Sequence, residues 1–232
     1  MKLRLRYSKL GKIRFTSHRD TARVWERAMR RAGVPVATSA GFTPRPRLSF
    51  GLALPTGAES VAEYLDLDIV DAAMSDDDLA ALPAALDEVL PVGFCALVVG
   101  RREPGAGSLQ QEVTAVTWEL TVAGAVDVDG AVERVLGATT LPLERERKGE
   151  RRIDDIRPAI RTLAVTGDGT LVADVATVGR GLRPAELIAV VLPGADVAAL
   201  RALRTHQWIE HDGHRRDVMA LPAAVPAPLV GA

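Results

Sequence analysis

The hydrophobic pattern of the first hundred residues switches repeatedly between strand-like and helix-like spacing, and the order of these switches most constrains the fold. Alternation of apolar and polar residues predicts strands, and apolar residues three or four apart predict amphipathic helices. The expected strands are 2–7 with 12–16, 34–39, 48–54, 62–70 and 92–99, and the expected helices are 17–32 and 75–89. With one extra piece in the middle strand region, this is the order β-α-β-β-α-β of a ferredoxin-like domain.

The first helix has clear start and stop signals. Ser17 and Asp20 have the spacing of an N-terminal capping box, and Gly33 follows the last apolar position. The apolar stripe includes Trp25 and Met29. The opposite side carries basic residues at spacings of four, four and three, namely Arg19, Arg23, Arg27 and Arg30, with Arg31 beside them.

The second half of the chain partly repeats this pattern. Residues 101–111 contain proline and glycine and are expected to be a linker. Strands are expected at 113–122, 141–147, 160–165 and 171–178, and helices at 128–137 and 183–192. We therefore expect an α+β protein of tandem ferredoxin-like domains, at 1–100 and 112–219. The proline- and alanine-rich end, 220–232, is expected to be disordered.

The net charge of −1 conceals a strong segregation of charge. Residues 1–50 carry thirteen Lys or Arg against two acids, whereas residues 51–100 carry ten acids and no Lys or Arg. Arginine supplies 25 of the 29 basic residues, and it binds phosphates through two hydrogen bonds and stacks on bases. Unless the two segments neutralise each other in the fold, this pattern predicts an anionic partner, with nucleic acid favoured.

The candidate nucleic-acid contacts all lie in this basic segment. The prolines of the loop 41–51 restrict its backbone, and the loop carries two aromatic residues that are either core residues or base-stacking groups. The predicted contact residues are Arg4, Arg6, Lys12, Arg14, His18, Arg19, Arg23, Phe42, Arg45, Arg47 and Phe50.

Candidate catalytic and metal-binding residues are fewer. His18 follows a strand at a helix start among cations, so it could bind phosphate or act as a general acid or base. Three histidines near the C-terminus have a spacing that could ligate a metal, or they could simply face solvent; they are His206, His211 and His214. The carboxylates of Asp66 and Asp68 share one face of a strand and could hold a magnesium ion, but a polar sheet face explains them more simply. We expect no metal site and no cofactor.

A single cysteine, Cys95, excludes an intrachain disulfide, a zinc ribbon and a protein-ligated iron–sulfur cluster. No apolar run reaches the ~18 residues of a membrane-spanning helix, and the N-terminal residues have charges throughout. We therefore expect a cytoplasmic protein with no membrane partner.

Residues 3–20, with the sequence LRLRYSKLGKIRFTSHRD, and 41–51, with the sequence GFTPRPRLSFG, resemble the opening of the radical-SAM-linked proteins, a bacterial domain of unknown function. The stretches 25–33, 54–60 and 63–66 extend the resemblance, and weaker likenesses lie at 147–157 and 181–184. The resemblance implies work related to RNA, beside a separate radical S-adenosylmethionine (radical SAM) enzyme or a ribonuclease. A looser, fold-level likeness is to the tandem ferredoxin-like endoribonucleases of CRISPR repeats.

Three functions remain open from the sequence. The preferred hypothesis is a non-catalytic accessory protein that binds RNA, such as tRNA or rRNA, or presents a substrate to the partner enzyme. The first alternative is a metal-independent endoribonuclease that uses His18. The second is an adaptor whose basic face binds an acidic protein.

Overall fold

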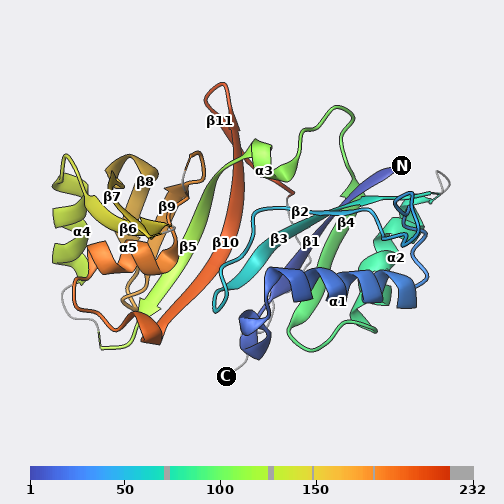
Figure 1. Cartoon of the computed structure of the whole chain (residues 1–232), viewed down its shortest axis with the longest axis horizontal. Coiled ribbons are helices and arrows are strands. Elements are labelled where there is room, and N and C mark those ends of the chain that lie inside the picture. Colours follow the sequence, from blue (N-terminus) through green and yellow to red (C-terminus); the bar gives the residue numbers. More distant parts are fainter. Residues whose placement is uncertain (71–73, 125–127, 148, 180, 220–232) are drawn as a thin grey trace. The chain divides into compact units, whose positions relative to one another are not determined.

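The chain forms two α+β units, each built around antiparallel strands (Figure 1). The computed structural model describes residues 1–70, 74–124, 128–147, 149–179 and 181–219. Unit 1 comprises Met1–Glu112 and the chain from Asp217 onward, and unit 2 comprises Val113–Arg216. Unit 1 is therefore discontinuous in sequence, because unit 2 is inserted before its last segment.

Unit 1 follows the order β-α-β-β-α-β that the hydrophobic pattern predicts, with η marking a short 3-10 helix. Its elements are β1 (Lys2–Lys9), η1 (Gly11–Phe15), α1 (His18–Arg31), β2 (Leu48–Phe50), β3 (Glu59–Asp68), α2 (Asp76–Asp87), β4 (Phe94–Arg101) and α3 (Leu109–Glu112). Its strands have the order β4-β1-β3-β2, and all neighbouring pairs are antiparallel. In this order β3 lies between β1 and β2.

The core of unit 1 joins one face of the sheet to both long helices. Leu3, Leu5 and Tyr7 of β1 are buried in the same apolar cluster as Trp25 of α1 and Leu86 of α2. The rings of Tyr7 and Trp25 lie 4.8 Å apart between centroids. The alternation of β1 and the apolar stripe of α1 therefore face each other, which fixes the outward direction of the opposite side of α1.

Both long helices of unit 1 begin at serine caps. The backbone N–H of Asp20 donates to the Ser17 hydroxyl at 3.2 Å, and the Asp78 N–H donates to the Ser75 hydroxyl at 3.1 Å. Asp78 also accepts from the backbone N–H of Ser75, which completes a capping box. The starts of both helices are confirmed.

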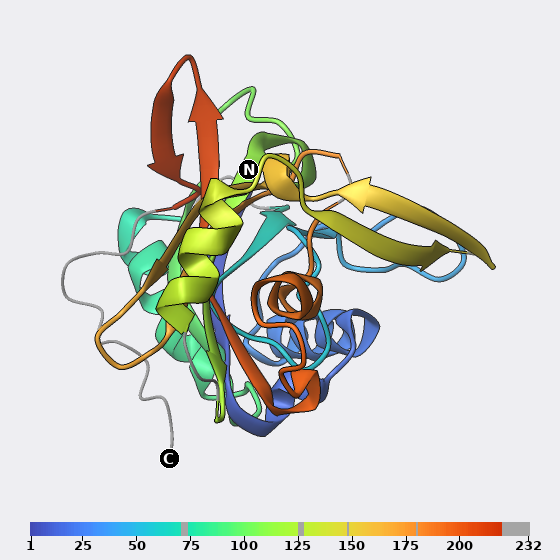
Figure 2. The same cartoon turned by 90° about the vertical axis from the view of Figure 1, so that its left-hand side faces the viewer.

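Unit 2 has the same succession with a hairpin inserted. Its elements are β5 (Val113–Val122), α4 (Val128–Gly137), β6 (Pro142–Arg147), β7 (Glu150–Asp155), η2 (Arg157–Ala159), β8 (Ile160–Val165), β9 (Leu171–Ala176), α5 (Pro184–Val191), η3 (Val197–Ala199), β10 (Leu200–His211) and β11 (His214–Asp217). The main strands have the order β10-β5-β9-β8, and β11 pairs with β10. Strands β6 and β7 form a separate two-stranded ribbon that extends from the rest of the unit (Figure 2).

Several expected strands differ from the structure. Residues 12–16 are not a strand, because Gly11 adopts φ +70° and the chain leaves the sheet into η1. The expected strand at 34–39 is reduced to the isolated bridges Val36–Ile69 and Thr38–Pro46. Residues 141–147 belong to the β6–β7 ribbon and not to the main sheet of unit 2.

The ends of the expected domains also differ in detail. Strand β4 extends to Arg101 and α3 occupies 109–112, so the segment expected as a linker contains regular structure. Strands β10 and β11 were not expected from the sequence. The expected disordered tail, 220–232, lies outside the described residues.

Two arginines of β1 lie inside unit 1 on the face of the sheet opposite the apolar core. Arg4 is 6 % exposed and donates two hydrogen bonds to Asp66, at 2.7 and 3.0 Å. Arg6 is 3 % exposed and donates to Asp217 at 2.9 Å and to the backbone carbonyl of Met219 at 2.8 Å. Because each buried guanidinium faces a carboxylate, the charges on this second face of the sheet are compensated within unit 1.

Replacement of Asp66 by alanine is expected to lower the free energy of unfolding by about 3–5 kcal/mol, because the guanidinium of Arg4 stays buried without its main counter-charge. Urea denaturation followed by circular dichroism measures this change. The control is Glu144→Ala, which removes an exposed partner of Arg151 and should change stability by less than about 1 kcal/mol. Similar losses for both variants would contradict a structural role for the buried pair.

Candidate functional site

The outer side of α1 carries an uninterrupted row of exposed arginines. We call this set the basic face: Arg19, Arg23, Arg27, Arg30 and Arg31. Arg23 pairs with Asp20 at 3.1 Å, and the Arg27 side chain donates to the carbonyl of Arg23 at 3.2 Å. Arg30 and Arg31 make no ion pair with any residue in the described part of the chain. The row therefore presents guanidinium groups to solvent along the whole helix.

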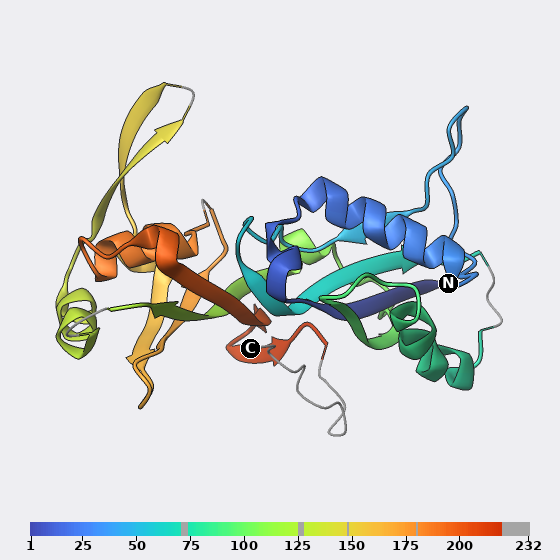
Figure 3. The same ribbon diagram turned by 90° about the horizontal axis from the view of Figure 1, so that it is seen from below.

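A loop that follows α1 carries an exposed aromatic residue at its tip. We call residues 38–47 the Phe42 loop. It is closed by hydrogen bonds in both directions between Ser39 and Arg45, at 2.8 and 3.1 Å. The ring of Phe42 is fully exposed, and Arg45 and Arg47 are also exposed. The loop stands out from unit 1 beside α1 (Figure 3).

The structure divides the predicted contact residues into three groups. On the surface lie Lys12, His18, Arg19, Arg23, Phe42, Arg45 and Arg47. Arg14 and Phe50 are half-buried. Arg4 and Arg6 are buried and paired with carboxylates, so the expectation that β1 presents them to a ligand is wrong.

The structure distinguishes the two phenylalanines that the sequence analysis left as either core residues or base-stacking groups. The ring of Phe50 packs edge-on against His18 at a centroid distance of 5.4 Å, whereas Phe42 packs on nothing in the core. An exposed ring of this size beside two arginines can stack on an unpaired base. Arg47 lies 3.9 Å from Asp68, a weak surface pair that leaves its guanidinium largely exposed.

The predicted contact set stops at Arg23, although three further arginines continue the same exposed row. Arg27, Arg30 and Arg31 lie on the same side of α1. Their spacing in the sequence was sufficient to include them, because residues three and four apart share one face of a helix.

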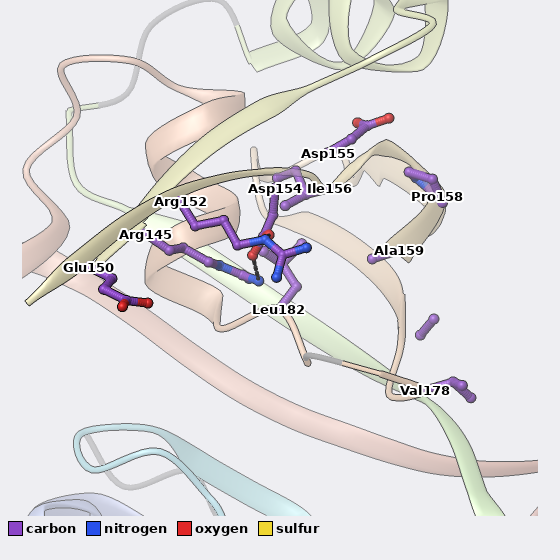
Figure 4. Close-up of a pocket in the computed structure, with 11 residues that line it drawn as sticks. Arg145, Glu150, Arg152, Asp154, Asp155, Ile156, Pro158, Ala159, Val178 and Leu182 are labelled. Atoms are coloured by element: carbon purple, nitrogen blue, oxygen red, sulfur yellow. Dashed lines mark hydrogen bonds and ion pairs between the residues drawn. The ribbon is translucent and has the colours of Figure 1, made fainter. Parts of the chain in front are cut away.

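A cavity of about 850 Å³ lies in unit 2, under the β6–β7 ribbon (Figure 4). Arg145, only 6 % exposed, donates to Asp154 at 3.2 Å and to Glu186 at 2.8 Å. Asp155 accepts from the backbone N–H groups of Leu141 and Arg157, and these bonds lower its pKa. The buried guanidinium of Arg145 thus has two carboxylate partners within unit 2, which argues for a structural role.

The C-terminal histidines are spread along one hairpin. His206 stacks on Trp208 at 4.8 Å, and His211 lies beside Asp212 at the end of β10. Within the described residues, no group of three His, Cys, Asp or Glu side chains is arranged to hold a metal ion. In the same residues, no helix is long and apolar enough to span a membrane.

A comparison with protein families assigns the chain to one bacterial family. Residues 2–184 match the model of a family described as an uncharacterized protein conserved in bacteria, DUF2344. The chain belongs to this family. The match includes α1, the Phe42 loop and the β6–β7 ribbon, and it ends at the first residue of α5. No curated protein matches the chain.

The cysteine of β4 is expected to be a poor nucleophile. Burial, together with the nearby Asp87 carboxylate that accepts the thiol proton at 3.1 Å, raises the pKa of Cys95 to about 12. At pH 8 its thiolate fraction should be about a thousandfold lower than for a thiol of pKa 9. Alkylation by iodoacetamide should accordingly be slow in the folded protein.

Mass spectrometry measures this rate of alkylation, and urea-unfolded protein provides the reference for an accessible thiol. Asp87→Asn removes the negative charge beside the sulfur and should accelerate the reaction. Equal rates in the folded and unfolded protein would contradict the assignment.

Proposed function

We propose that this protein binds RNA through the basic face and the Phe42 loop and acts as a non-catalytic accessory protein. The observation that carries the proposal is the row of exposed arginines on α1, with Arg30, Arg31 and Arg45 outside ion-pair distance of every described acid. Exposed guanidinium groups bind phosphate oxygens in pairs of hydrogen bonds. Such a row along one helix matches the spacing of a polyanion better than it matches a single small anion.

The Phe42 loop favours unpaired RNA over a duplex. Proteins recognise RNA sequences mostly in single-stranded loops and ends, where exposed bases stack on aromatic side chains. Phe42 offers such a ring at the tip of a loop whose ends are held by Ser39 and Arg45. The adjacent Arg45 and Arg47 would hold the flanking phosphates. A structured RNA with an accessible loop, such as tRNA or rRNA, combines both features.

We also propose that both units are ferredoxin-like domains. In unit 1 the strands have the order β4-β1-β3-β2, and in unit 2 the strands β5, β8, β9 and β10 have the equivalent order β10-β5-β9-β8. In each unit helices follow the first and third strands of this succession. The β6–β7 ribbon is then an insertion between the first helix and second strand of the second domain.

The proposed partner is a separate enzyme that acts on the bound RNA. The resemblance to radical-SAM-linked proteins favours a radical SAM enzyme, and a ribonuclease is the other candidate. A radical SAM enzyme holds an iron–sulfur cluster through three cysteine thiolates, and this sequence has a single cysteine. Its contribution would therefore be to bind and position the substrate.

The combined change Arg19→Gln, Arg23→Gln and Arg27→Gln should weaken RNA binding by at least about tenfold at 0.1 M salt. It should also lower the slope of log K against log salt by about 3, because each lost phosphate contact lowers it by about 1. Glutamine keeps the helix propensity of α1. Fluorescence anisotropy with labelled tRNA at several salt concentrations measures both quantities.

The matched control removes three paired arginines from other surfaces. Arg101→Gln, Arg151→Gln and Arg161→Gln change the net charge by the same amount, but these side chains pair with Asp76, Glu144 and Glu210. This control should bind RNA nearly as the wild type does. Equal losses for the two triple variants would show that net charge alone drives binding, and no binding by the wild type at low salt would reject the proposal.

Phe42→Ala should reduce the affinity for a single-stranded oligomer by about five- to a hundredfold, the range for loss of one stacked base. The salt slope should stay unchanged, because no phosphate contact is lost. The unfolding midpoint should also stay unchanged, since the ring is fully exposed. Phe42→Trp should retain the affinity, and wild-type binding by Phe42→Ala would exclude the loop from the interface.

The same preparations separate the two alternatives. A metal-independent endoribonuclease would cleave RNA in chelator, and His18→Ala would abolish the cleavage. We expect intact RNA with both proteins, because metal-independent cleavage needs two positioned proton-transfer groups and the ring of His18 packs against Phe50. An acidic protein retained on the basic face after nuclease treatment would favour the adaptor.

A further inference from the structure

A groove in unit 1 runs along one flank of the basic face. It has a volume of about 500 Å³ and lies between α1 and the chain that follows α2. Its apolar lining comes from Val24 and Ala28 of α1 and from the segment Val89, Leu90 and Pro91. This volume is within the range of about 300–1,000 Å³ that small-molecule sites occupy.

Charged groups of opposite sign line the two sides of this groove. Arg27 and Arg31 belong to α1, one helical turn apart, and Glu88 caps the C-terminal end of α2. Arg31 and Glu88 form no ion pair with each other or with any other residue in the described ranges. The groove thus offers donors for phosphate on one side and a free carboxylate on the other.

The dipole of α2 disfavours a carboxylate at the position of Glu88. The C-terminal end of a helix carries a partial negative charge, and the last turn of α2 contains no basic residue. The neighbouring Asp87 accepts from the backbone N–H of Ala96 at 2.7 Å, whereas no donor in the described residues reaches the Glu88 carboxylate. A ligand that brings N–H donors to Glu88 would relieve this repulsion.

We propose that the groove binds one guanine base of an RNA strand whose phosphates lie on Arg27 and Arg31. The inference rests on the proposed RNA binding and adds the base that is selected. The base would lie against the apolar surface of Val24 and Leu90, and its Watson–Crick edge would face Glu88. One nucleotide would thereby use the apolar floor, both arginines and the carboxylate of the groove.

The chemistry of the carboxylate selects guanine among the four bases. Guanine presents two adjacent donors, N1–H and the N2 amino group, which match the two oxygens of Glu88. The other three bases each place an acceptor beside their donor on this edge, and that acceptor would repel a carboxylate. Two hydrogen bonds from one edge of a base typically discriminate strongly against the wrong base.

The test compares uridine 12-mers that carry one central guanosine, inosine or adenosine, with the all-uridine strand as the reference. The wild type should bind the guanosine oligomer about tenfold more tightly than the adenosine oligomer in fluorescence anisotropy. Inosine, which lacks the N2 amino group, should lose most of this preference. Glu88→Gln should abolish the preference for guanosine and leave the affinity for all-uridine RNA unchanged.

The matched control is Asp77→Asn, which neutralises an exposed acid at the opposite end of α2 and should keep the preference. Binding of every oligomer with equal affinity by the wild type would overturn the guanine site and leave RNA binding intact. A preference for guanosine that survives in Glu88→Gln would also overturn it. No binding to any oligomer would reject the proposed function and the guanine site together.

Discussion

The charge that unit 1 presents on its surface depends on which of its arginines are paired with carboxylates in its interior, and two arginines of β1 are paired in this way. Arg4 and Arg6 lie next to β3 in the sheet, where Asp66 supplies the counter-charge for Arg4, and Asp217 supplies it for Arg6 from the far end of the sequence. Asp217 also accepts from the hydroxyl of Tyr64 at 2.7 Å. Burial raises the pKa of Tyr64 well above its usual value, and Asp217 adds to this effect while the charge of Arg6 opposes it, so the hydroxyl keeps its proton for this bond.

This pairing explains what becomes of the segregated charge. The basic first segment and the acidic second segment neutralise each other in part, through Arg4 with Asp66 and through the looser pair of Arg47 with Asp68. The arginines of α1 are on the other side of the helix from the core and do not reach these acids. A nearly neutral chain therefore retains a helix whose exposed side is almost entirely basic, and that remainder supports the proposed RNA interface.

The sequence predicted best those features that depend on neighbouring residues. The caps at Ser17 and Ser75, the arginine row of α1 and the position of strand β3 follow from local patterns, and the structure has all of them. Both faces of β3 are buried, however, although its alternation suggested one polar face. The burial of Arg4 and Arg6 was not predictable from alternation, because the second side of β1 is covered by groups from residues 102–112 and 217–219. Strand β10 was missed because its register shifts twice against β5, which interrupts the alternation. The exposure of Phe42 also depends on the tertiary fold, since a loop phenylalanine followed by prolines fits a core as well as a surface.

Because the chain returns to unit 1 at Asp217, unit 2 is fully synthesised before unit 1. All of unit 2 leaves the ribosome before Asp217, so unit 2 can fold while the last segment of unit 1 is still missing. Until residues 217–219 emerge, Arg6 lacks its carboxylate and the hydroxyl of Tyr64 lacks its acceptor. The basic helix of unit 1 is synthesised early, yet the sheet beneath it receives its last polar contacts only from the end of the chain. Cleavage just before Asp217 would consequently weaken the unit that carries the arginine row, although the cut lies almost two hundred residues away from it in sequence.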